Sequence, residues 1–341
     1  MLSKRQFVLA LAVTLAVVAA INVVLALLAQ RTLPRRIMRR AAESPSAEVL
    51  AIGNSLMVAG FHESSFDSAA GVPPAHAAVN LGLGASTPVE QLLLFRYAIA
   101  HGMRPRLLIY GFYDFQLTDP VTMTNADLIG NRAILYYLEP EYARRFYSLT
   151  AHDAVEFEVM RFFPMFVERG AVWSKVEEFR RLLSQQGLPA RRTNQFGRAS
   201  DFSLLEASSS EEFTRHCDSA RAAGLASPVE ELLRQARAAE IPVAVIEMPM
   251  SPYHLRAFYS SPAWPAYVSH LRSLFAPYDV SFVDASNWVT DGSLFADNLH
   301  LSPAGGQEFS RELGDLVRKE FSLQTSAAST PQIPHSRESR P

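Results

Sequence analysis

The sequence has little of what several common classes of protein require. It contains one cysteine, Cys217, so it can form neither an intramolecular disulfide nor a cysteine cage for a metal ion. Its formal net charge is −2 at pH 7, and no basic stripe interleaved with aromatic residues gives reason to expect nucleic acid as a partner. It also lacks a P-loop, an HExxH motif and an EF-hand loop. We therefore expect neither a metal site nor a bound cofactor.

One feature that is present is a long apolar run near the N-terminus, residues 7–29, with Thr14 and Asn22 as its only polar residues. About 20 apolar residues suffice for a helix to cross a ~30 Å hydrocarbon core. A cleaved signal peptide would have a shorter apolar region and a small residue where Leu27 stands. The pattern favours an uncleaved single-pass anchor over residues 1–30. A buried core helix is the alternative, which the all-round apolar surface disfavours.

The charges that flank this run bear on its orientation. Lys4 and Arg5 precede it, whereas arginines are frequent in residues 31–40. The positive-inside rule, taken literally, would place the rest of the chain in the cytoplasm. The function expected below calls instead for a domain on the periplasmic side of the inner (cytoplasmic) membrane. We keep that location as the expectation and leave the orientation open.

The remaining sequence divides into a linker, one large domain and a tail. Residues 31–46 are basic and then contain Ser and Pro, which predicts a linker. Residues 324–341 are polar and rich in Pro and Ser, which predicts a disordered tail. Between them lies a domain over residues 47–323, interrupted by an aromatic-rich helical insert at about 115–226. Most aromatic residues of the insert should be core, but three could face a membrane or a partner: Phe162, Phe163 and Phe166.

Short apolar segments in the domain predict five strands, at 48–52, 77–81, 106–111, 242–248 and 279–284. Most are apolar throughout, which is typical of strands covered on both faces. Helix start signals lie between or after them, at Thr87-Pro88 with Glu90, Ser227-Pro228 with Glu230, and Ser302-Pro303. The alternation of strand and helix predicts an α/β fold, a three-layer α/β/α sandwich around a five-stranded parallel sheet.

Polar segments follow several predicted strands, where ligand sites form in parallel sheets. Gly53-Asn54-Ser55 follows the first strand. A serine hydroxyl is a poor nucleophile unless a base takes its proton and a further group orients that base. His300 is the best candidate base, because Asp297 precedes it by three residues in a turn-like segment. The sequence thus predicts a catalytic triad of Ser55, His300 and Asp297. The alternative is a turn hydroxyl and a structural histidine.

The Gly-rich turn over residues 82–85 is suited to donating backbone N–H groups to an oxyanion. Interpreted as a dinucleotide-binding loop, Gly82-x-Gly84 would lack both the third small residue and an acidic partner downstream. We therefore favour the oxyanion role.

In this order the segments resemble the blocks of the SGNH (GDSL-type) hydrolases, over roughly residues 47–322 apart from the insert. The family's Gly-Asp-Ser block stands here as Gly53-Asn54-Ser55, and its Asp-x-x-His block as Asp297 and His300. Its Asn-x-Gly-type turn is matched by NLGLGAST from Asn80, with the usual glycine falling at Gly84 or Ala85.

The third block departs from the family pattern. Gly-x-Asn-Asp is expected, and Tyr113 stands in place of the Asn that supplies an oxyanion donor. Loss of one such donor costs on the order of 10²–10³ in rate. The resemblance implies that the oxyanion or substrate is held by residues at Asn54, Gly84, Ala85 and Tyr113, with catalysis reshaped or weakened.

The resemblance implies a serine esterase or O-acyltransferase in which acyl groups pass from Ser55 to water or to a sugar hydroxyl. With its anchor and insert, the chain is similar to membrane-tethered SGNH-like proteins of bacterial cell envelopes, several of which act with membrane-bound O-acyltransferases. The expected partners are an acylated glycan or lipid substrate, the membrane, and such an acyltransferase. The alternative is a non-catalytic accessory protein that binds a glycan or the acyltransferase, with Tyr113 as the sign of lost activity.

Overall fold

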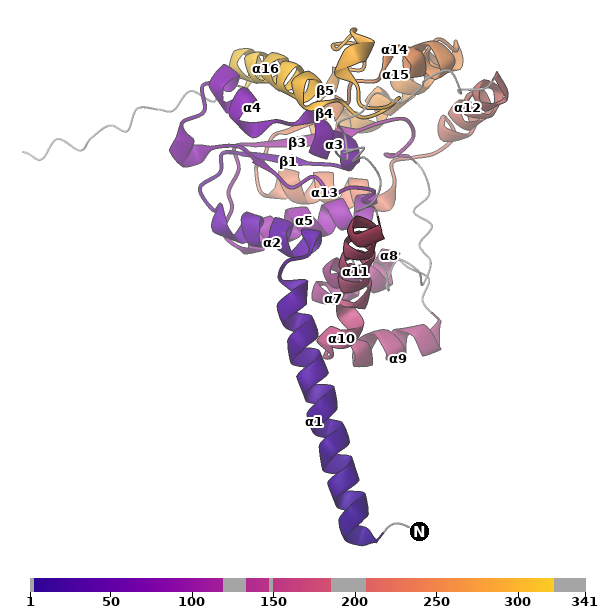
Figure 1. Ribbon diagram of the computed structural model, residues 1–341. Helices are drawn as coiled ribbons and strands as arrows, with labels where there is room; N and C mark the ends of the chain where they lie inside the picture. The colour runs from indigo at the N-terminus through magenta and orange to yellow at the C-terminus, as the bar shows by residue number, and fades with distance from the viewer. Residues whose placement is uncertain (1–2, 119–132, 147–149, 185–206, 322–341) are drawn as a thin grey trace, which may run out of the picture.

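A computed structural model of the chain describes residues 3–118, 133–146, 150–184 and 207–321. These residues form a parallel five-stranded sheet with the strand order β2-β1-β3-β4-β5 (Figure 1). The strands are β1 (Val49–Ile52), β2 (Val79–Asn80), β3 (Leu107–Phe112), β4 (Val243–Glu247) and β5 (Val280–Asp284). All five predicted strands and their parallel pairing are therefore confirmed.

Burial of the strands follows their position in the sheet. β1, β3 and β4 are buried throughout, as their continuous apolar sequences predict. β5 has no fully buried residue, because it is an edge strand that pairs on one side with β4. Helices cover both faces of the sheet (Figure 1). On one face lie α5 (Pro88–Ala100) and α13 (Ser227–Ala238), and on the other α4 (Glu63–Ala70) and α16 (Pro303–Glu320). α15 (Ala263–Phe275) packs its Phe275 ring against Phe282 of β5.

Two of the three predicted helix starts are confirmed. Thr87 caps α5 in a capping box with Glu90, and the Ser302 hydroxyl accepts the Gly305 N–H at the start of α16. The third start is one residue earlier than predicted, because the N-cap of α13 is Ala226 and no side chain caps the helix. The Ala226 N–H donates to the Leu117 carbonyl oxygen at 2.7 Å, which holds the chain where the helix begins.

The segment expected to be a linker contains a helix, α2 (Leu33–Glu43), so that expectation is wrong for most of residues 31–46. Ile37, Met38 and Ala41 are buried on the side of α2 that faces the domain, where the helix packs on α5. The basic composition concealed this apolar stripe, because the arginines occupy the other side of the same helix.

The described part of the insert is largely helical, as predicted. Its described helices are α7 (Ala133–Leu138), α8 (Pro140–Phe146), α9 (Ala151–Met160), α10 (Pro164–Val167), α11 (Arg169–Ser184) and α12 (Ala207–Ala220). Phe162 and Phe163 are exposed, whereas Phe166 is half-buried. Short helical segments elsewhere are α3 (Ser55–Gly60), η1 (Pro74–His76), α14 (Pro252–His254), η3 (Leu255–Tyr259), η4 (Ala276–Tyr278) and η5 (Gly292–Leu294).

The apolar N-terminal run forms α1 (Lys4–Ala29), which projects from the base of the domain and ends far from the sheet (Figure 1). It is long and apolar enough to cross a membrane, by length and composition, as a single-pass anchor or a signal sequence would be. The predicted tail, residues 324–341, lies outside the described residues.

Candidate active site at the carboxyl edge of the sheet

Ser55 lies immediately beyond the carboxyl end of β1, at the start of α3. The turn between them requires a glycine at position 53, where φ is +156°. A Cβ there would lie 2.7 Å from the Gly111 carbonyl oxygen and 2.9 Å from the Met57 Cβ. The Asn54 side chain then caps α3 by accepting the Leu56 N–H at 2.8 Å. Turn and cap together fix the position of the serine.

His300 reaches Ser55 from the other end of the domain, 245 residues away in the sequence. Its Nε2 lies 2.8 Å from the Ser55 Oγ, and its Nδ1 lies 2.8 Å from the Asp297 Oδ2. The loop that carries both residues is closed by a hydrogen bond from the Ala296 N–H to the His300 carbonyl oxygen. The structure therefore places the three predicted triad residues in one chain of hydrogen bonds.

The order of this chain suits proton transfer. When Nδ1 donates to Asp297, the lone pair of Nε2 faces Ser55 and can accept the hydroxyl proton. The His300 side chain is 19 % exposed and that of Asp297 is 32 % exposed. This relay, the chain of hydrogen bonds from Ser55 through His300 to Asp297, therefore borders solvent.

Asp297 is held as a carboxylate by its surroundings. Burial alone would raise its pKa, but hydrogen bonds from the His300 side chain and from the backbone N–H groups of His300 and Leu299 outweigh it. The pKa of Asp297 is therefore below its ordinary value. A carboxylate at this position can stabilise the imidazolium that forms when His300 takes a proton.

The Gly-rich turn lies against the turn that carries Ser55. The Gly53 carbonyl oxygen accepts the Leu83 N–H at 3.0 Å and the Ser86 hydroxyl at 3.1 Å. Ala85 has a left-handed backbone with φ of 54°, and a Cβ at Gly84 would meet nothing within 4 Å. The structure thus brings the predicted oxyanion segment next to the serine turn, with open space at Gly84.

Asn80 fastens the Gly-rich turn to the helix that Ser55 begins. Its side-chain amide donates to the carbonyl oxygens of Met57 at 3.0 Å and Phe61 at 3.1 Å, while its Oδ1 accepts the Gly82 N–H. Sequence reasoning placed Asn80 in the turn but missed this clamp. The signal was present, since an Asn two residues before a Gly can accept that glycine's N–H.

Two other predicted site residues, Asn54 and Tyr113, differ in their burial. Asn54 is buried, and its side chain is engaged within the protein, with Nδ2 donating to the Gln116 Oε1 at 2.9 Å. It organises the serine turn, because its oxygen caps α3. Tyr113 is half-buried and packs partly against the core.

A second group of titratable residues lies at the same edge of the sheet. The Asp114 Oδ1 accepts the Tyr259 hydroxyl at 2.8 Å and lies 3.1 Å from the His254 Nε2. Glu247, at the end of β4, is fully buried. Burial, followed by the negative charges of Asp284 and Asp114, raises its pKa well above the ordinary value. Sequence reasoning missed this cluster because Asp114 lies 140 residues from His254.

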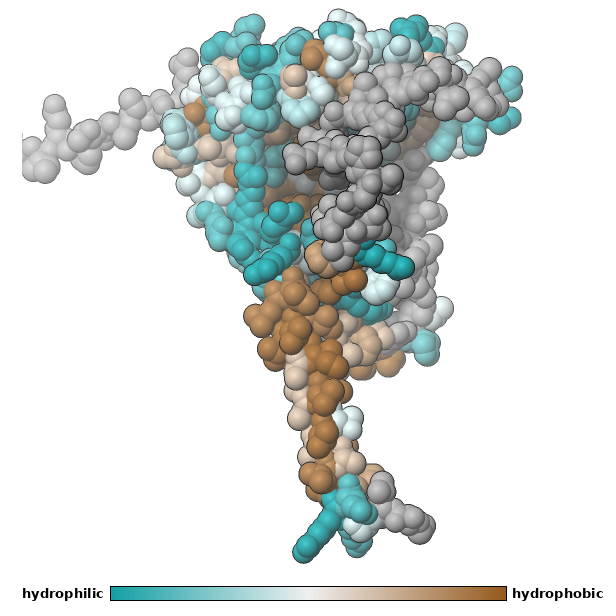
Figure 2. Space-filling view, in the orientation of Figure 1, coloured by the Kyte–Doolittle hydropathy of each residue, from teal (hydrophilic) through white to brown (hydrophobic). Residues whose placement is uncertain are grey.

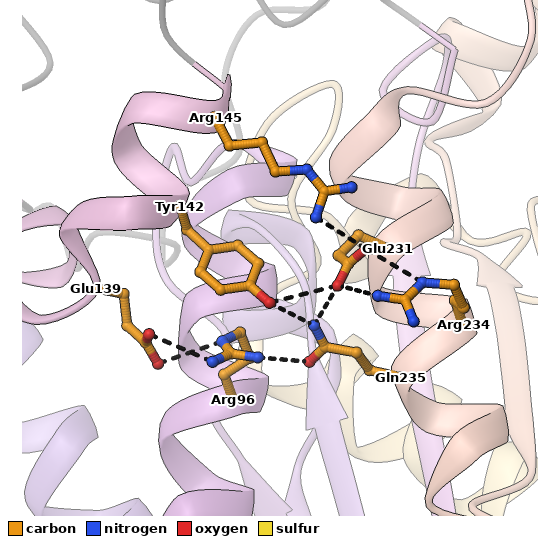
Figure 3. Close-up of polar contacts among 7 residues, drawn as sticks. All are labelled: Arg96, Glu139, Tyr142, Arg145, Glu231, Arg234 and Gln235. Carbon is orange, nitrogen blue, oxygen red and sulfur yellow. Dashed lines mark hydrogen bonds and ion pairs between the residues drawn. The ribbon is translucent and has the colours of Figure 1, made fainter.

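A separate polar cluster lies between α5, α8 and α13 (Figure 3). Buried Glu231 accepts hydrogen bonds from Arg234 and Gln235 and is paired with Arg145 at 3.2 Å. Burial opposes ionisation, but these partners lower the pKa of Glu231 to about 2. The adjoining cavity of about 480 Å³ is lined by Glu231, Arg234 and Gln235, and by Arg96 and Glu139, which pair with each other. These groups satisfy one another and include no activated nucleophile, so the cluster ties the insert to the domain.

Within the described ranges, no group of three or more His, Cys, Asp or Glu side chains is arranged to hold a metal ion.

Comparisons with known proteins add little to this geometry. A scan against models of known protein families and a search of curated proteins found no match. Among solved structures, the chain is similar to one described as that of a "putative acylhydrolase" from Bacteroides fragilis, with 12 % sequence identity and a TM-score of 0.39. The similarity covers 84 % of this chain and 96 % of the other.

Proposed function

We propose that this chain is an SGNH-type serine hydrolase or acyltransferase acting on ester-linked acyl groups. The observation that supports the proposal is the unbroken chain of hydrogen bonds from the Ser55 hydroxyl through His300 to Asp297 at the open edge of a parallel sheet. This is the arrangement that activates a serine hydroxyl, because it joins the nucleophile to a base and the base to an orienting carboxylate.

The proposed reaction has two halves that share an acyl-serine. In the first, the Ser55 Oγ attacks the ester carbonyl carbon as its proton passes to the His300 Nε2. The tetrahedral intermediate then collapses, and the leaving alkoxide takes that proton. In the second, His300 deprotonates water or a sugar hydroxyl, which attacks the acyl-serine and releases Ser55 after the proton returns. Asp297 stays ionised throughout and stabilises the imidazolium.

The negative oxygen of each tetrahedral intermediate needs hydrogen-bond donors. We assign this role to the backbone N–H groups of Ser55 and of Gly84 or Ala85. This assignment is supported by the two hydrogen bonds that hold the Gly-rich turn against Gly53. The Tyr113 hydroxyl is proposed as a further donor in place of the usual Asn.

The N-terminal helix supports the proposed location. With α1 as an uncleaved single-pass anchor in the inner membrane, the site would serve substrates at the membrane surface, such as an acylated envelope glycan or lipid. We propose that the domain lies outside the cytoplasm, where a membrane-bound O-acyltransferase could exchange acyl groups with it. A reporter fused after Pro341 that is active only in the cytoplasm would test this orientation, and its activity would overturn it.

The catalytic proposal is tested with a fluorophosphonate probe, which forms a covalent bond with an activated serine. The native protein should be labelled and Ser55→Ala should not. Ser64→Ala, an exposed serine of α4 outside the relay, is the matched control and should be labelled like the native protein. A correctly folded native protein that takes up no label would contradict the proposal and favour the non-catalytic accessory protein.

A further inference from the structure

The helical insert contacts α1 well below the base of the domain. The Asn22 Oδ1 accepts the N–H of Met165 in α10 at 3.1 Å, and its Nδ2 donates to the Val18 carbonyl oxygen. Val18, Asn22 and Leu25 are half-buried and Ala29 is buried, whereas most of α1 is exposed. Their spacing of i, i+4, i+7 and i+11 defines one stripe of the helix, which packs on α10 and α11.

The depth of this contact follows from helix geometry. Asn22 precedes Ala29 by seven residues, which is about 10 Å along a helix axis. The apolar run over residues 7–29 is about 35 Å long, while the hydrocarbon core measures about 30 Å. If α1 spans the membrane, α10 therefore lies about 5–10 Å within the boundary of the leaflet nearest the domain, the depth typical of interfacial helices.

The insert presents an apolar face at this depth. Val155 and Val159 lie one helical turn apart on α9, and Phe162 and Phe163 follow between α9 and α10; all four side chains are 40–69 % exposed. Phe157, on the other side of α9, is buried. Space-filling atoms show apolar surface along α1 and at the base of the insert (Figure 2). A soluble surface would not gather large apolar side chains into such a stripe without a partner.

Charged residues lie where lipid headgroups would be. Arg31, Arg36 and Arg39 are exposed just past the end of α1, and hydrophilic surface of α2 lies directly above the apolar helix (Figure 2). Arg35 in α2 pairs with buried Glu168 between α10 and α11 at 2.5 Å, which fastens the insert to the same end of the domain. An apolar stripe below a band of arginines matches the polarity of an anionic leaflet.

We propose that α9 and α10 are a second membrane contact, with the stripe of Val155, Val159, Phe162 and Phe163 in the acyl-chain boundary of the leaflet on the domain's side. The occupant of this apolar face is lipid. Two contacts fix the tilt of the domain as well as its distance from the membrane, and this holds the edge of the sheet over the lipid surface. The inference rests on α1 spanning the membrane and not on the catalytic proposal.

The test uses full-length protein in vesicles of phosphatidylcholine and phosphatidylglycerol, with and without acyl-chain-brominated phosphatidylcholine. A bimane fluorophore is attached at Phe162→Cys in the stripe, at Leu15→Cys within α1, or at Arg311→Cys, an exposed position of α16. Cys217 is fully buried, and burial raises the pKa of its thiol to about 11, so the added cysteine is the one that reacts. Bromine should quench the fluorophore at positions 162 and 15 about twofold or more and leave position 311 unchanged.

Each other outcome has a distinct meaning. Quenching at 15 without quenching at 162 would overturn the second contact while retaining the anchor. Absence of quenching at both positions would overturn the anchor and the inference with it. If the cysteine at position 162 is protected from labelling with bimane in native membranes but not in pure lipid vesicles, a protein partner covers this face. That result would also overturn the proposal. None of these results depends on whether Ser55 is reactive.

Discussion

Two clusters at one edge of the sheet contain the same chemical groups in a different order. In the first, His300 lies between Ser55 and Asp297 and contacts each through a different ring nitrogen. In the second, Asp114 is central, and its Oδ1 contacts both the Tyr259 hydroxyl and the His254 ring. The first arrangement can move a proton from hydroxyl to imidazole. The second cannot, because its hydroxyl and its imidazole both meet the carboxylate.

Burial also separates the two histidines. The His254 side chain is 4 % exposed, and its Nδ1 has no hydrogen-bond partner among the described residues. The His300 side chain is 19 % exposed and borders solvent. The comparison teaches that residue types alone do not make a site, because the position of the imidazole and its access to solvent decide what the group can do.

The largest expected effect separates the two histidines. His300→Ala should lower ester hydrolysis by on the order of 10⁵- to 10⁶-fold, because the serine loses its base. His254→Ala should instead destabilise the fold by about 1–3 kcal/mol, since it removes a buried partner of Asp114, and should leave the rate per folded molecule nearly unchanged. Turnover of a nitrophenyl ester and thermal unfolding measure the two effects. Equal rate losses in both variants would contradict the assignment of a catalytic role to His300 and a structural role to His254.

Asp297→Asn should produce the next largest effect. The amide cannot stabilise the imidazolium and favours the wrong tautomer of His300, so the rate should fall on the order of 10³- to 10⁴-fold. The paired change, Asp114→Asn, retains an acceptor for the Tyr259 hydroxyl and should affect unfolding more than turnover. Steady-state kinetics on both variants checks this, and an active Asp297→Asn protein would exclude a triad role for Asp297.

Two tyrosines provide a third comparison. If the Tyr113 hydroxyl donates to the oxyanion, Tyr113→Phe should lower the rate on the order of 10²-fold with little change in KM. Tyr259→Phe loses a hydrogen bond to Asp114 and should lower stability by about 1–3 kcal/mol while keeping most of the rate. A Tyr113→Phe variant with native kcat would show that the Tyr113 hydroxyl is not a donor and that the backbone N–H groups alone hold the oxyanion.

The smallest effect is expected at Glu247 and depends on pH. Its folded pKa is raised, so the stability due to the neutral carboxyl is complete below 4.5, the ordinary value, and is lost as pH rises through the folded pKa. Glu247→Gln mimics the neutral form at every pH. The variant should match the native Tm near pH 4 and exceed it increasingly as pH rises, with activity within a few-fold. A difference in Tm that does not change with pH would contradict a neutral Glu247.

The local parts of the site could be predicted because their signals are short. Asp297 and His300 share one loop, and a carboxylate three residues before a histidine reaches it without help from the rest of the fold. The meeting of His300 with Ser55 was predictable only through the strand pattern, which places all strand ends at one edge. Their 2.8 Å separation depends on the packing of α3 against α16 and could not be predicted from sequence.

Composition led to a wrong prediction for a helix whose two faces differ in polarity. Residues 33–43 look like a basic linker, yet three apolar residues of this segment pack on α5. The same limit applies to Asn22, which resembles a stray polar residue in an apolar run until Met165 is brought beside it from the insert. In both cases the partner surface lies far away in the sequence, so a local pattern carries no sign of it.

The sequence by itself determined the apolar N-terminal helix, the five parallel strands and the pairing of Asp297 with His300. These depend on local hydrophobic runs and on contacts within a few residues. Tertiary structure alone decided that Asp114, His254 and Glu247 lie in one cluster, that Asn80 clamps the Gly-rich turn to α3, and that α10 reaches α1. These contacts join residues distant in the chain, and their burial and distance exist only once the sheet and its helices have packed.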